Sequence, residues 1–212
     1  MKFVHGKKLR IINKRSAFIE KTVKAGENLT VYENNRIEGD TVIGNNVTIR
    51  PGCYVKDCVI GDNAVITSSH CENAVIGDGC SVGPFARLRP GAVLGKGVKI
   101  GNFVEIKNAV IGDGTKVSHL AYVGDADVGK NCNIGCGAIF VNYNGKNKNR
   151  SVVKDDCFIG SNCNLIAPVT VEKGSYVCAG TTVTESVDAD AFVIGRARQT
   201  VKENRAHEYL KD

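Results

Sequence analysis

A hydrophobic period of six residues runs through the middle of the chain and constrains the fold more than any other feature of the sequence. A helical face recurs at three and four residues and a strand face at two, so neither accounts for a period of six. The aliphatic positions, with two steps of five among the steps of six, are Ile76, Val82, Leu88, Leu94, Ile100, Ile106, Ile111, Val117, Val123, Val128 and Ile134. Glycine often follows the aliphatic residue, and this combination is typical of hexapeptide coils.

The period predicts an all-β chain folded as a triangular parallel β-helix, in which three hexads, or about eighteen residues, complete one coil. The aliphatic residue of each hexad is expected to point inward, and glycine to accommodate the tight corners. A smaller inward residue is expected four places later, at Cys80, Ala86, Ala92, Thr115, Ala121, Cys132 and Ala138. One coil cannot bury its own inward face, so the coils must stack.

The composition indicates a single domain of 212 residues with a narrow core. Aromatic residues make up only 6% and tryptophan is absent, which suits layers of Ile, Val and Leu. No apolar run reaches the ~20 residues of a membrane-spanning helix. The net charge of +6 favours anionic ligands, and no recognition module for nucleic acid accompanies it.

Nine cysteines would indicate disulfides in a secreted protein, but the N-terminus has no signal-peptide pattern and no Cys-x-x-Cys pair indicates zinc. A cytoplasmic location is therefore expected. Five cysteines occupy the fifth hexad position and are interpreted as small buried apolar residues rather than metal or redox groups: Cys53, Cys80, Cys132, Cys157 and Cys163.

The hexads divide the chain into three parts. Residues 1–28 lack the period and are expected to form a basic N-terminal arm, residues 29–195 the β-helix domain, and residues 196–212 a C-terminal tail. Within the domain the period stops after Ile139 and resumes at Val153, which predicts an exposed inserted loop near residues 140–152. The polar run at 67–73 predicts a turn at or beside His70, with this side chain at the surface.

Three side chains of the central hexads are candidates for chemistry. Arg89 and Lys107 are eighteen residues apart, so they are expected one coil apart on one face, with strands about 4.8 Å from each other. Such a pair of cations suits one phosphate group. His119 follows at a corner beside that face and is the candidate general base, because a free imidazole titrates near pH 6.5. Spacing alone does not require a functional role for these residues. Arg89 and Lys107 could instead belong to a solvated charged face, and His119 could be a structural histidine.

Several segments, taken in order, resemble one acyltransferase family. They are GPFARLRPGA, VKIGNFVEIKNA, SHLAYVGDADVG, NIGCG, VNYNG, IGSNCNLIAPVTV and AGTTVT. Over residues 37–198 the sequence resembles the C-terminal acetyltransferase domain of the bifunctional UDP-N-acetylglucosamine pyrophosphorylase/glucosamine-1-phosphate N-acetyltransferase. Hexads occur in many acyltransferases, whereas RLRPGA, VEIK, SHLxYxGDA and the NYxGxxK loop are specific to this family. The sequence has no Gly-rich nucleotide loop, so uridylyltransferase activity is not expected of it.

The resemblance implies a left-handed parallel β-helix that assembles as a homotrimer with active sites between subunits. It implies acetyl transfer from acetyl-CoA to the amine of glucosamine 1-phosphate, with no metal required. The product, N-acetylglucosamine 1-phosphate, would serve the synthesis of UDP-N-acetylglucosamine, a cell wall precursor.

The resemblance also implies roles for individual residues. His119 would be the catalytic general base. The substrate-binding residues would be Arg89, Lys107, Tyr122, Asn133 and Lys148. The residues on the acetyl-CoA side would be Cys136, Asn142, Tyr143, Ser161, Ala179 and Arg196, with a backbone N–H near Cys136 facing the thioester oxyanion.

Four residues depart from the family pattern, and none of them removes a catalytic group. Asn144 stands where Asp is usual, Cys136 stands where Ala is usual, and Ala138 and Phe140 replace polar residues before the loop. Two alternatives stay open. One is an acetyltransferase that acts on another amino sugar or sugar phosphate, and the other is a non-catalytic trimeric scaffold for a separate uridylyltransferase.

Overall fold

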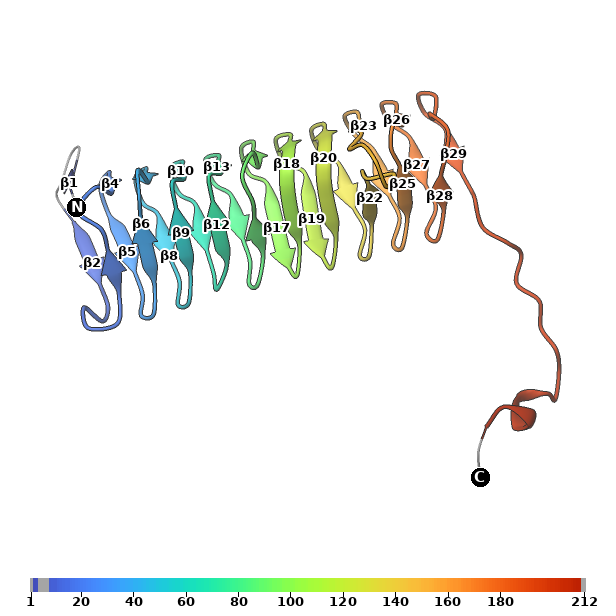
Figure 1. The fold of residues 1–212 in the computed structure, drawn as a ribbon, viewed down its shortest axis with the longest axis horizontal. Coiled ribbons are helices and arrows are strands. Elements are labelled where there is room, and N and C mark those ends of the chain that lie inside the picture. The colour runs from blue at the N-terminus through green and yellow to red at the C-terminus, as the bar shows by residue number, and fades with distance from the viewer. Residues whose placement is uncertain (1, 4–7, 211–212) are drawn as a thin grey trace.

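The computed structural model describes residues 2–3 and 8–210 and is a solenoid of parallel β-strands. Coils of short strands stack in about ten turns along one axis, with β2 (Leu9–Ile11) and β29 (Phe192–Val193) near opposite ends of the stack (Figure 1). The described residues contain no α-helix, and one 3-10 helix, η1 (Ala206–Glu208), lies in the tail. The predicted all-β hexapeptide solenoid is therefore confirmed.

Each coil contributes one strand to each side of a triangle, so the strands form three faces. The first face contains β2 (Leu9–Ile11), β5 (Leu29–Val31), β8 (Thr48–Ile49), β11 (Val65–Ile66), β14 (Ser81–Val82), β17 (Lys99–Asn102), β19 (Lys116–His119), β21 (Asn133–Ile134), β24 (Phe158–Ile159), β27 (Tyr176–Val177) and β29 (Phe192–Val193). The second face contains β3 (Phe18–Ile19), β6 (Arg36–Glu38), β9 (Tyr54–Lys56), β12 (His70–Glu72), β15 (Arg87–Leu88), β22 (Ile139–Val141), β25 (Asn164–Ile166) and β28 (Thr182–Val183). The third face contains β1 (Lys2–Phe3), β4 (Lys24–Ala25), β7 (Val42–Ile43), β10 (Val59–Ile60), β13 (Val75–Ile76), β16 (Val93–Leu94), β23 (Ser151–Val153) and β26 (Thr170–Val171). Two longer strands, β18 (Glu105–Ile111) and β20 (Tyr122–Val128), bend from the second face onto the third.

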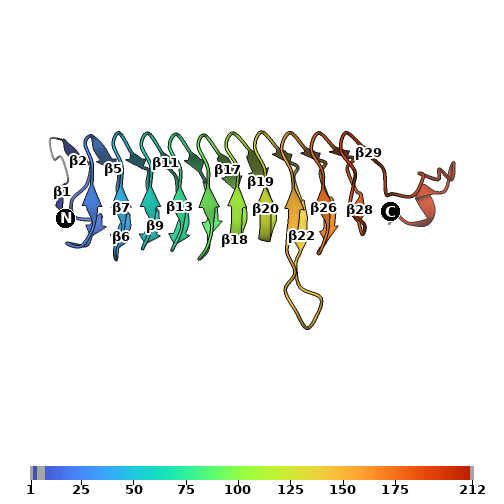
Figure 2. The same ribbon diagram turned by 90° about the horizontal axis from the view of Figure 1, so that it is seen from above.

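Parallel pairing sets the length of each coil. Lys99 on β17 pairs with Lys116 on β19, seventeen residues later, so a five-residue step shortens the coil by one residue. Ile139 on β22 pairs with Asn164 on β25, twenty-five residues later. The excess forms a loop, residues 142–150, which projects from the body of the solenoid between β22 and β23 (Figure 2). The predicted insertion is present where the hexads were interrupted.

The predicted inward positions form the core of the solenoid. Each aliphatic residue of the central hexads exposes at most 3% of its surface. Burial of one such side chain contributes ~1.5–3 kcal/mol, so the stacked layers dominate the stability of the fold. The five cysteines at fifth hexad positions are buried as well, which confirms that they are core residues, and all nine cysteines are free thiols.

The core differs from the prediction next to the loop, where the hexad period does not stop after Ile139. Phe140 stands six residues after Ile134 and is the bulkiest of the fully buried side chains. Ile139 points outward and is 36% exposed. The period was missed here because only aliphatic residues were counted, and an aromatic ring occupies the inward position.

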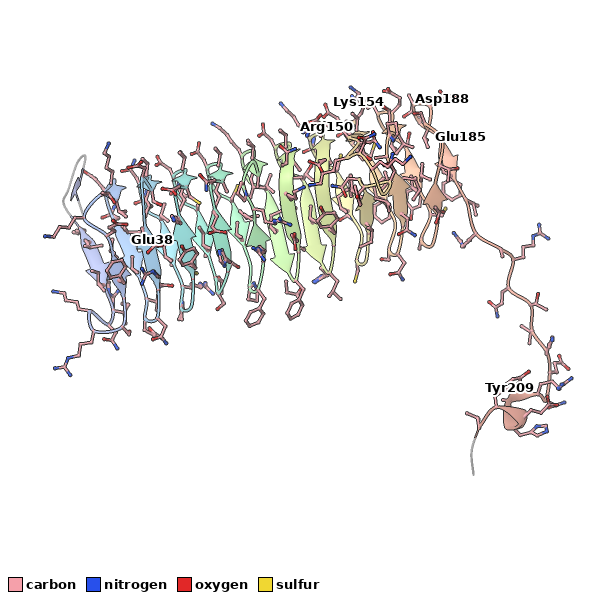
Figure 3. All side chains as sticks on the ribbon, in the orientation of Figure 1. Glu38, Arg150, Lys154, Glu185, Asp188 and Tyr209 are labelled. Atoms are coloured by element: carbon pink, nitrogen blue, oxygen red, sulfur yellow. The ribbon has the colours of Figure 1, made fainter. Side chains whose placement is uncertain are left out.

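His70 lies in β12 on the second face, beside the corner at Ser68, where φ is 40°, so the turn expected at or beside His70 is present. Its ring lies 4.5 Å from that of Tyr54, between centroids, and the Tyr54 hydroxyl donates to Glu38 Oε1 at 2.7 Å. Glu38 marks this N-terminal part of the solenoid in Figure 3. The polar sequence concealed a strand whose one inward side chain is Cys71.

The first coil begins before residue 29. Strand β2 pairs with β5, β3 with β6, and β4 with β7. The hexad period is absent there, yet Val23 and Ala25 are fully buried. Part of the segment expected as an arm is therefore the first coil, and residues 1 and 4–7 lie outside the described residues. At the other end, residues 196–210 leave the solenoid as a tail (Figure 1).

Candidate active site

His119 ends β19 at the corner where the first face meets the second. Its partner in register is Asn102, one coil earlier, and His119 Nδ1–H donates to Asn102 Oδ1 at 2.6 Å. An amide oxygen only accepts, so this bond places the proton of the neutral ring on Nδ1 and leaves the lone pair on Nε2. The imidazole is exposed and can therefore accept a proton from a bound molecule.

The same corner continues toward the C-terminus as a row of small side chains. Cys136, Ser161 and Ala179 follow His119 in successive coils, as the pairing of β19, β21, β24 and β27 dictates. We call these four residues the His119 row. Arg196 joins its end, where Nη1 donates to the carbonyl oxygen of Ala179 at 2.9 Å. The row is an accessible strip with an imidazole at one end and a guanidinium at the other.

An apolar hollow of about 310 Å³ lies beside His119. The rings of Phe85 and Phe103 stack in its wall with centroids 5.5 Å apart, and both side chains are more than half exposed. This hollow was not predicted from the sequence. It gives His119 an apolar neighbourhood on the side away from the second face.

A second polar group lies at the opposite edge of the second face, where β18 and β20 bend. Its centre is Asp125, which is 7% exposed and accepts from Asn108 Nδ2 at 2.6 Å, from Lys107 Nζ at 3.5 Å and from Asn142 Nδ2. Burial opposes ionisation of this carboxyl, but these hydrogen bonds and the charge of Lys107 hold the pKa of Asp125 below its usual value. We call Lys107, Asn108, Asp125 and Asn142 the Asp125 corner.

Two lysine side chains meet at the Asp125 corner, Lys107 of β18 and Lys148 of the loop. A hydrogen bond in which the Lys107 ammonium donates to the Lys148 amine, together with the charge of Lys107, lowers the pKa of Lys148, and the same hydrogen bond raises the pKa of Lys107 against the opposing effect of desolvation. Arg89 lies on the same face one coil before Lys107, and its Nη1 donates to Glu105 Oε1 at 2.8 Å. Adjacent cations of this kind favour a bound anion, above all a phosphate group.

Tyr122 lies across the second face and approaches the Asp125 corner. Its phenol covers Gly124, where an added Cβ would stand 2.3 Å from Tyr122 Oη. Asn142 Nδ2 donates to the Tyr122 hydroxyl at 3.4 Å. The missing side chain at Gly124 therefore allows Tyr122 to reach the loop.

The structure brings the candidate residues together in two groups and leaves two of them apart. No hydrogen bond or ion pair between described residues joins the His119 row to the Asp125 corner, and the second face lies between them. Asn133 stands on the first face, in register between Lys116 and Phe158. Tyr143 is exposed on the loop, where its hydroxyl donates to the carbonyl oxygen of Gly145 at 2.7 Å.

Two family models match the chain. The model described as GMPPB C-terminal domain matches residues 18–102 and 72–144, and the hexapeptide repeat of succinyl-transferase matches residues 152–185. The first model covers more than half of the residues. The chain belongs to the GMPPB C-terminal domain family. The projecting loop falls at the junction between the two matches, as expected of an insertion between coils.

Curated relatives match nearly the whole domain. Bifunctional protein GlmU of Geobacillus sp. is 49% identical over 92% of this chain and 42% of the relative. GlmU of Clostridium kluyveri is 46% identical over the same shares, and GlmU of Thermotoga maritima is 49% identical over 91% and 43%. The chain thus spans about two fifths of the length of these relatives and is homologous to their C-terminal acetyltransferase region, which confirms the resemblance.

Solved structures share the solenoid. Arabidopsis UDP-N-acetylglucosamine acyltransferase superposes with a TM-score of 0.54 at 17% identity, over 88% of this chain and 63% of that chain. The Francisella novicida enzyme of the same name gives 0.51 at 15% identity, over 82% and 66%. At these identities the likeness shows the fold alone. Along residues 2–3 and 8–210, no helix has the length and apolar character needed to cross a membrane.

The projecting loop is a short hairpin in which Asn144 accepts the hydrogen bonds that an aspartate would accept. Tyr143 and Lys148 form an antiparallel bridge. Asn144 Oδ1 accepts from the backbone N–H groups of Lys146 at 3.0 Å and Asn147 at 2.8 Å. A carboxylate oxygen accepts the same bonds. The departure at Asn144 therefore preserves the turn.

The other departures from the family pattern have different surroundings. Ala138 and Phe140 are fully buried in the core. Cys136 is the one half-buried thiol among cysteines that are otherwise buried. Its place in the His119 row keeps a small side chain there.

Several polar residues of the site escaped the sequence analysis, and Asn108 of the Asp125 corner is one of them. Asn102 precedes His119 by seventeen residues, so the coil spacing could have revealed it. Asp125 lies in the GDA motif, but nothing in the motif shows that its carboxylate is buried. Arg150 contacts Asp127, twenty-three residues away, and that contact depends on the path of the loop, for which the sequence has no signal.

Proposed function

We propose that this domain transfers the acetyl group of acetyl-CoA to the amine of glucosamine 1-phosphate, giving N-acetylglucosamine 1-phosphate and CoA. One observation carries the proposal. An imidazole with a free Nε2 lone pair borders one edge of the second face, and the Lys107 and Lys148 ammonium groups border the other. An amino sugar phosphate presents an amine and a phosphate, and the face offers a matching group for each. Homology to the acetyltransferase region of GlmU supports the same assignment.

In the proposed reaction His119 acts as general base. The neutral amine attacks the thioester carbonyl carbon, and His119 Nε2 accepts a proton from the nitrogen as the C–N bond forms. The C–S bond then breaks, and the sulfur of CoA takes the proton from the imidazolium. Asn102 holds the ring through Nδ1 during both transfers. Positioned proton transfer of this kind typically contributes ~10²- to 10⁴-fold to the rate.

The acceptor would lie on the second face. Its phosphate would contact Lys107, Lys148 and Arg89, and its sugar ring would contact Tyr122. The position of Tyr122 supports this, because its ring covers Gly124 on the second face and its hydroxyl approaches the Asp125 corner. Asn133 is on the first face, so it would contact the sugar of a neighbouring subunit.

Acetyl-CoA would lie along the His119 row, with its thioester near Cys136 and a phosphate near Arg196. Ser161 and Ala179 present little bulk along this path. Asn142 and Tyr143 start the loop at the Asp125 corner, and the loop projects away from the body of the solenoid (Figure 2). They would therefore reach acetyl-CoA bound to a second copy, which supports a homotrimer with active sites between subunits. Free thiols throughout suit a cytoplasmic enzyme.

Lys107→Met is expected to lower kcat/KM for the acceptor. Loss of one charge-assisted hydrogen bond to phosphate corresponds to roughly 10- to 100-fold. Steady-state kinetics with varied glucosamine 1-phosphate measures the effect, and Lys130→Met, which removes an exposed cation outside the site, is the matched control. An unchanged kcat/KM in Lys107→Met would show that the phosphate of the acceptor does not bind at the Asp125 corner.

Gly124→Ala is expected to raise the KM for the acceptor while the KM for acetyl-CoA stays within about twofold. The new methyl group would occupy the space of the Tyr122 phenol and displace the ring from the second face. Gly135→Ala is no suitable control, because backbone atoms of the next coil already stand within 2.6 Å of that Cβ position. Tyr122→Phe, which keeps the ring and loses the hydroxyl, provides the comparison. Equal acceptor KM values in Gly124→Ala and the parent would exclude this role for the ring.

A thiol-release assay tests the function as a whole. Acetyl-CoA is supplied with glucosamine 1-phosphate, with plain glucosamine or with other amino sugar phosphates. Release of CoA that depends on the phosphate of glucosamine 1-phosphate is the expected result. Activity with only a different amino sugar would show that the acceptor is that sugar and not glucosamine 1-phosphate. Failure of the chain to bind acetyl-CoA would favour the non-catalytic scaffold.

A further inference from the structure

Both ends of the projecting loop are tied to the same strand. The loop leaves the second face at Asn142 and rejoins the third face at β23. Asn142 donates to Asp125, and Arg150 binds Asp127, so two carboxylates of β20 hold the two ends. The loop is therefore a hairpin with two attachment points.

The first attachment point has a conformational cause. Asn108 and Asp125 are partners in the corner between the second and third faces, and both adopt left-handed backbone conformations, with φ of 45° and 47°. Asn142 is the equivalent residue of the next coil, but its φ is not positive. The chain consequently does not turn onto the third face there, and the Asp125 carboxylate binds the departing side chain instead.

The second attachment point is a guanidinium with four partners. Arg150 donates to both oxygens of Asp127, from Nε at 2.6 Å and from Nη2 at 2.5 Å. It also donates to the carbonyl oxygens of Asn108 at 3.0 Å and Ala126 at 2.9 Å. These partners belong to two successive coils, and Figure 3 labels Arg150 where the chain returns to the solenoid. The hydrogen bonds and the charge of Arg150 lower the pKa of Asp127 against the effect of burial.

We propose that Arg150 and Asp127 are positioning residues that fix the returning half of the loop and thereby keep the Lys148 ammonium group beside Lys107. The proposal rests on the proposed function for its meaning, since this pair of lysines is the phosphate site. Lys148 stands two residues before Arg150, and Tyr143 is its bridge partner across the hairpin. Strand β23 pairs with β20 only from Ser151 onward, so the Arg150 contacts are the ones that hold the last residue of the loop itself to β20.

Ordinary surface ion pairs contribute little, so the Arg150 contacts must be distinguished from them. Other pairs between coils, such as Lys130 with Asp113 at 3.7 Å and Lys173 with Asp156 at 3.5 Å, are single contacts of flexible ammonium groups. Arg150 instead makes a bidentate pair and two bonds to main-chain oxygens. A planar guanidinium with four fixed acceptors restricts the orientation of the backbone that carries it.

The test measures the loop and the enzyme separately in the full chain. Competitive labelling with a trace acylating reagent, followed by peptide mass spectrometry, gives the pKa of Lys148 without any substrate. Arg150→Gln is expected to raise this pKa toward that of an ordinary lysine, because Lys148 moves away from Lys107. The KM for glucosamine 1-phosphate is expected to rise about tenfold with little change in kcat, as partial loss of one charged contact implies.

Two further variants sharpen the result. Arg150→Lys keeps the charge and loses the bidentate geometry, so it should fall between Arg150→Gln and the parent. Lys130→Gln removes an exposed pair outside the loop and should leave the Lys148 pKa unchanged. An unchanged Lys148 pKa in Arg150→Gln would overturn the proposal. If the Lys148 pKa rises in Arg150→Gln but the parent chain shows no acetyl transfer at all, the positioning role of Arg150 stands and the proposed function is refuted.

Discussion

His119→Ala is expected to lower kcat by ~10²- to 10⁴-fold, the usual contribution of a positioned general base. The residue is exposed at a corner, and its side chain makes one hydrogen bond, to Asn102, so its removal should leave the fold and the oligomeric state unchanged. The KM for acetyl-CoA should change little, because the rest of the His119 row is intact. CoA release under saturating substrates measures the effect, and sedimentation of the same sample checks the assembly.

Asn102→Ala tests the contribution of the hydrogen bond that holds the His119 ring, separately from that of the imidazole itself. Loss of the amide oxygen frees the ring to rotate and to carry its proton on either nitrogen, so kcat should fall less than in His119→Ala. The double variant should be no slower than His119→Ala alone, since Asn102 acts through the imidazole. A His119→Ala enzyme with near-parental kcat would refute the assignment of the base, whatever the behaviour of Asn102→Ala.

The fold was predictable because one rule repeats along the chain. Each hexad places an aliphatic residue inward, and the buried layers follow this rule with 3% exposure or less. The rule failed in the first coil, where Val23 and Ala25 are buried without the hexad period, and at two later positions where another residue type points inward. Phe140 and Cys71 are both buried, but neither was recognised as the inward member of a strand. A pattern based on size and burial rather than on aliphatic identity would have included them.

The candidate site was predictable only in part, for a physical reason. Coil spacing places residues seventeen or eighteen apart side by side, so it anticipates the alignment of Arg89 with Lys107 and could have revealed Asn102. It says nothing of contacts that cross a corner or depend on the loop. The contacts of Arg150 are of this kind, since its partner Ala126 lies twenty-four residues away, across the loop. The partners of Asp125 lie seventeen or eighteen residues from it, so the coil spacing could have revealed the Asp125 corner, although not the burial of its carboxylate.

Phe140→Ala is expected to lower the free energy of unfolding by ~3–5 kcal/mol, the usual cost of truncating a buried phenylalanine. Phe140 is fully buried and pairs with Leu165 of the next coil, so the cavity would open between stacked layers that cannot close over it. Equilibrium unfolding in urea, followed by circular dichroism, measures the change. Each coil contacts only its neighbours, so the coils around Phe140 can unfold before the rest of the solenoid. A separate unfolding transition at lower urea concentration would therefore also confirm the prediction.

Ile139→Ala is the matched control, because the neighbouring side chain points outward and is 36% exposed. Its loss should cost far less than that of Phe140, and Phe140→Leu should cost less than ~1.5 kcal/mol because most of the volume is kept. The position also links stability to function. Phe140 precedes Asn142 by two residues, so a collapsed layer beneath it would shift the point where the loop leaves β22 and, with it, Lys148. Equal stability of Phe140→Ala and Ile139→Ala would contradict the inward placement of the ring, and with it the continuation of the hexad period up to the loop.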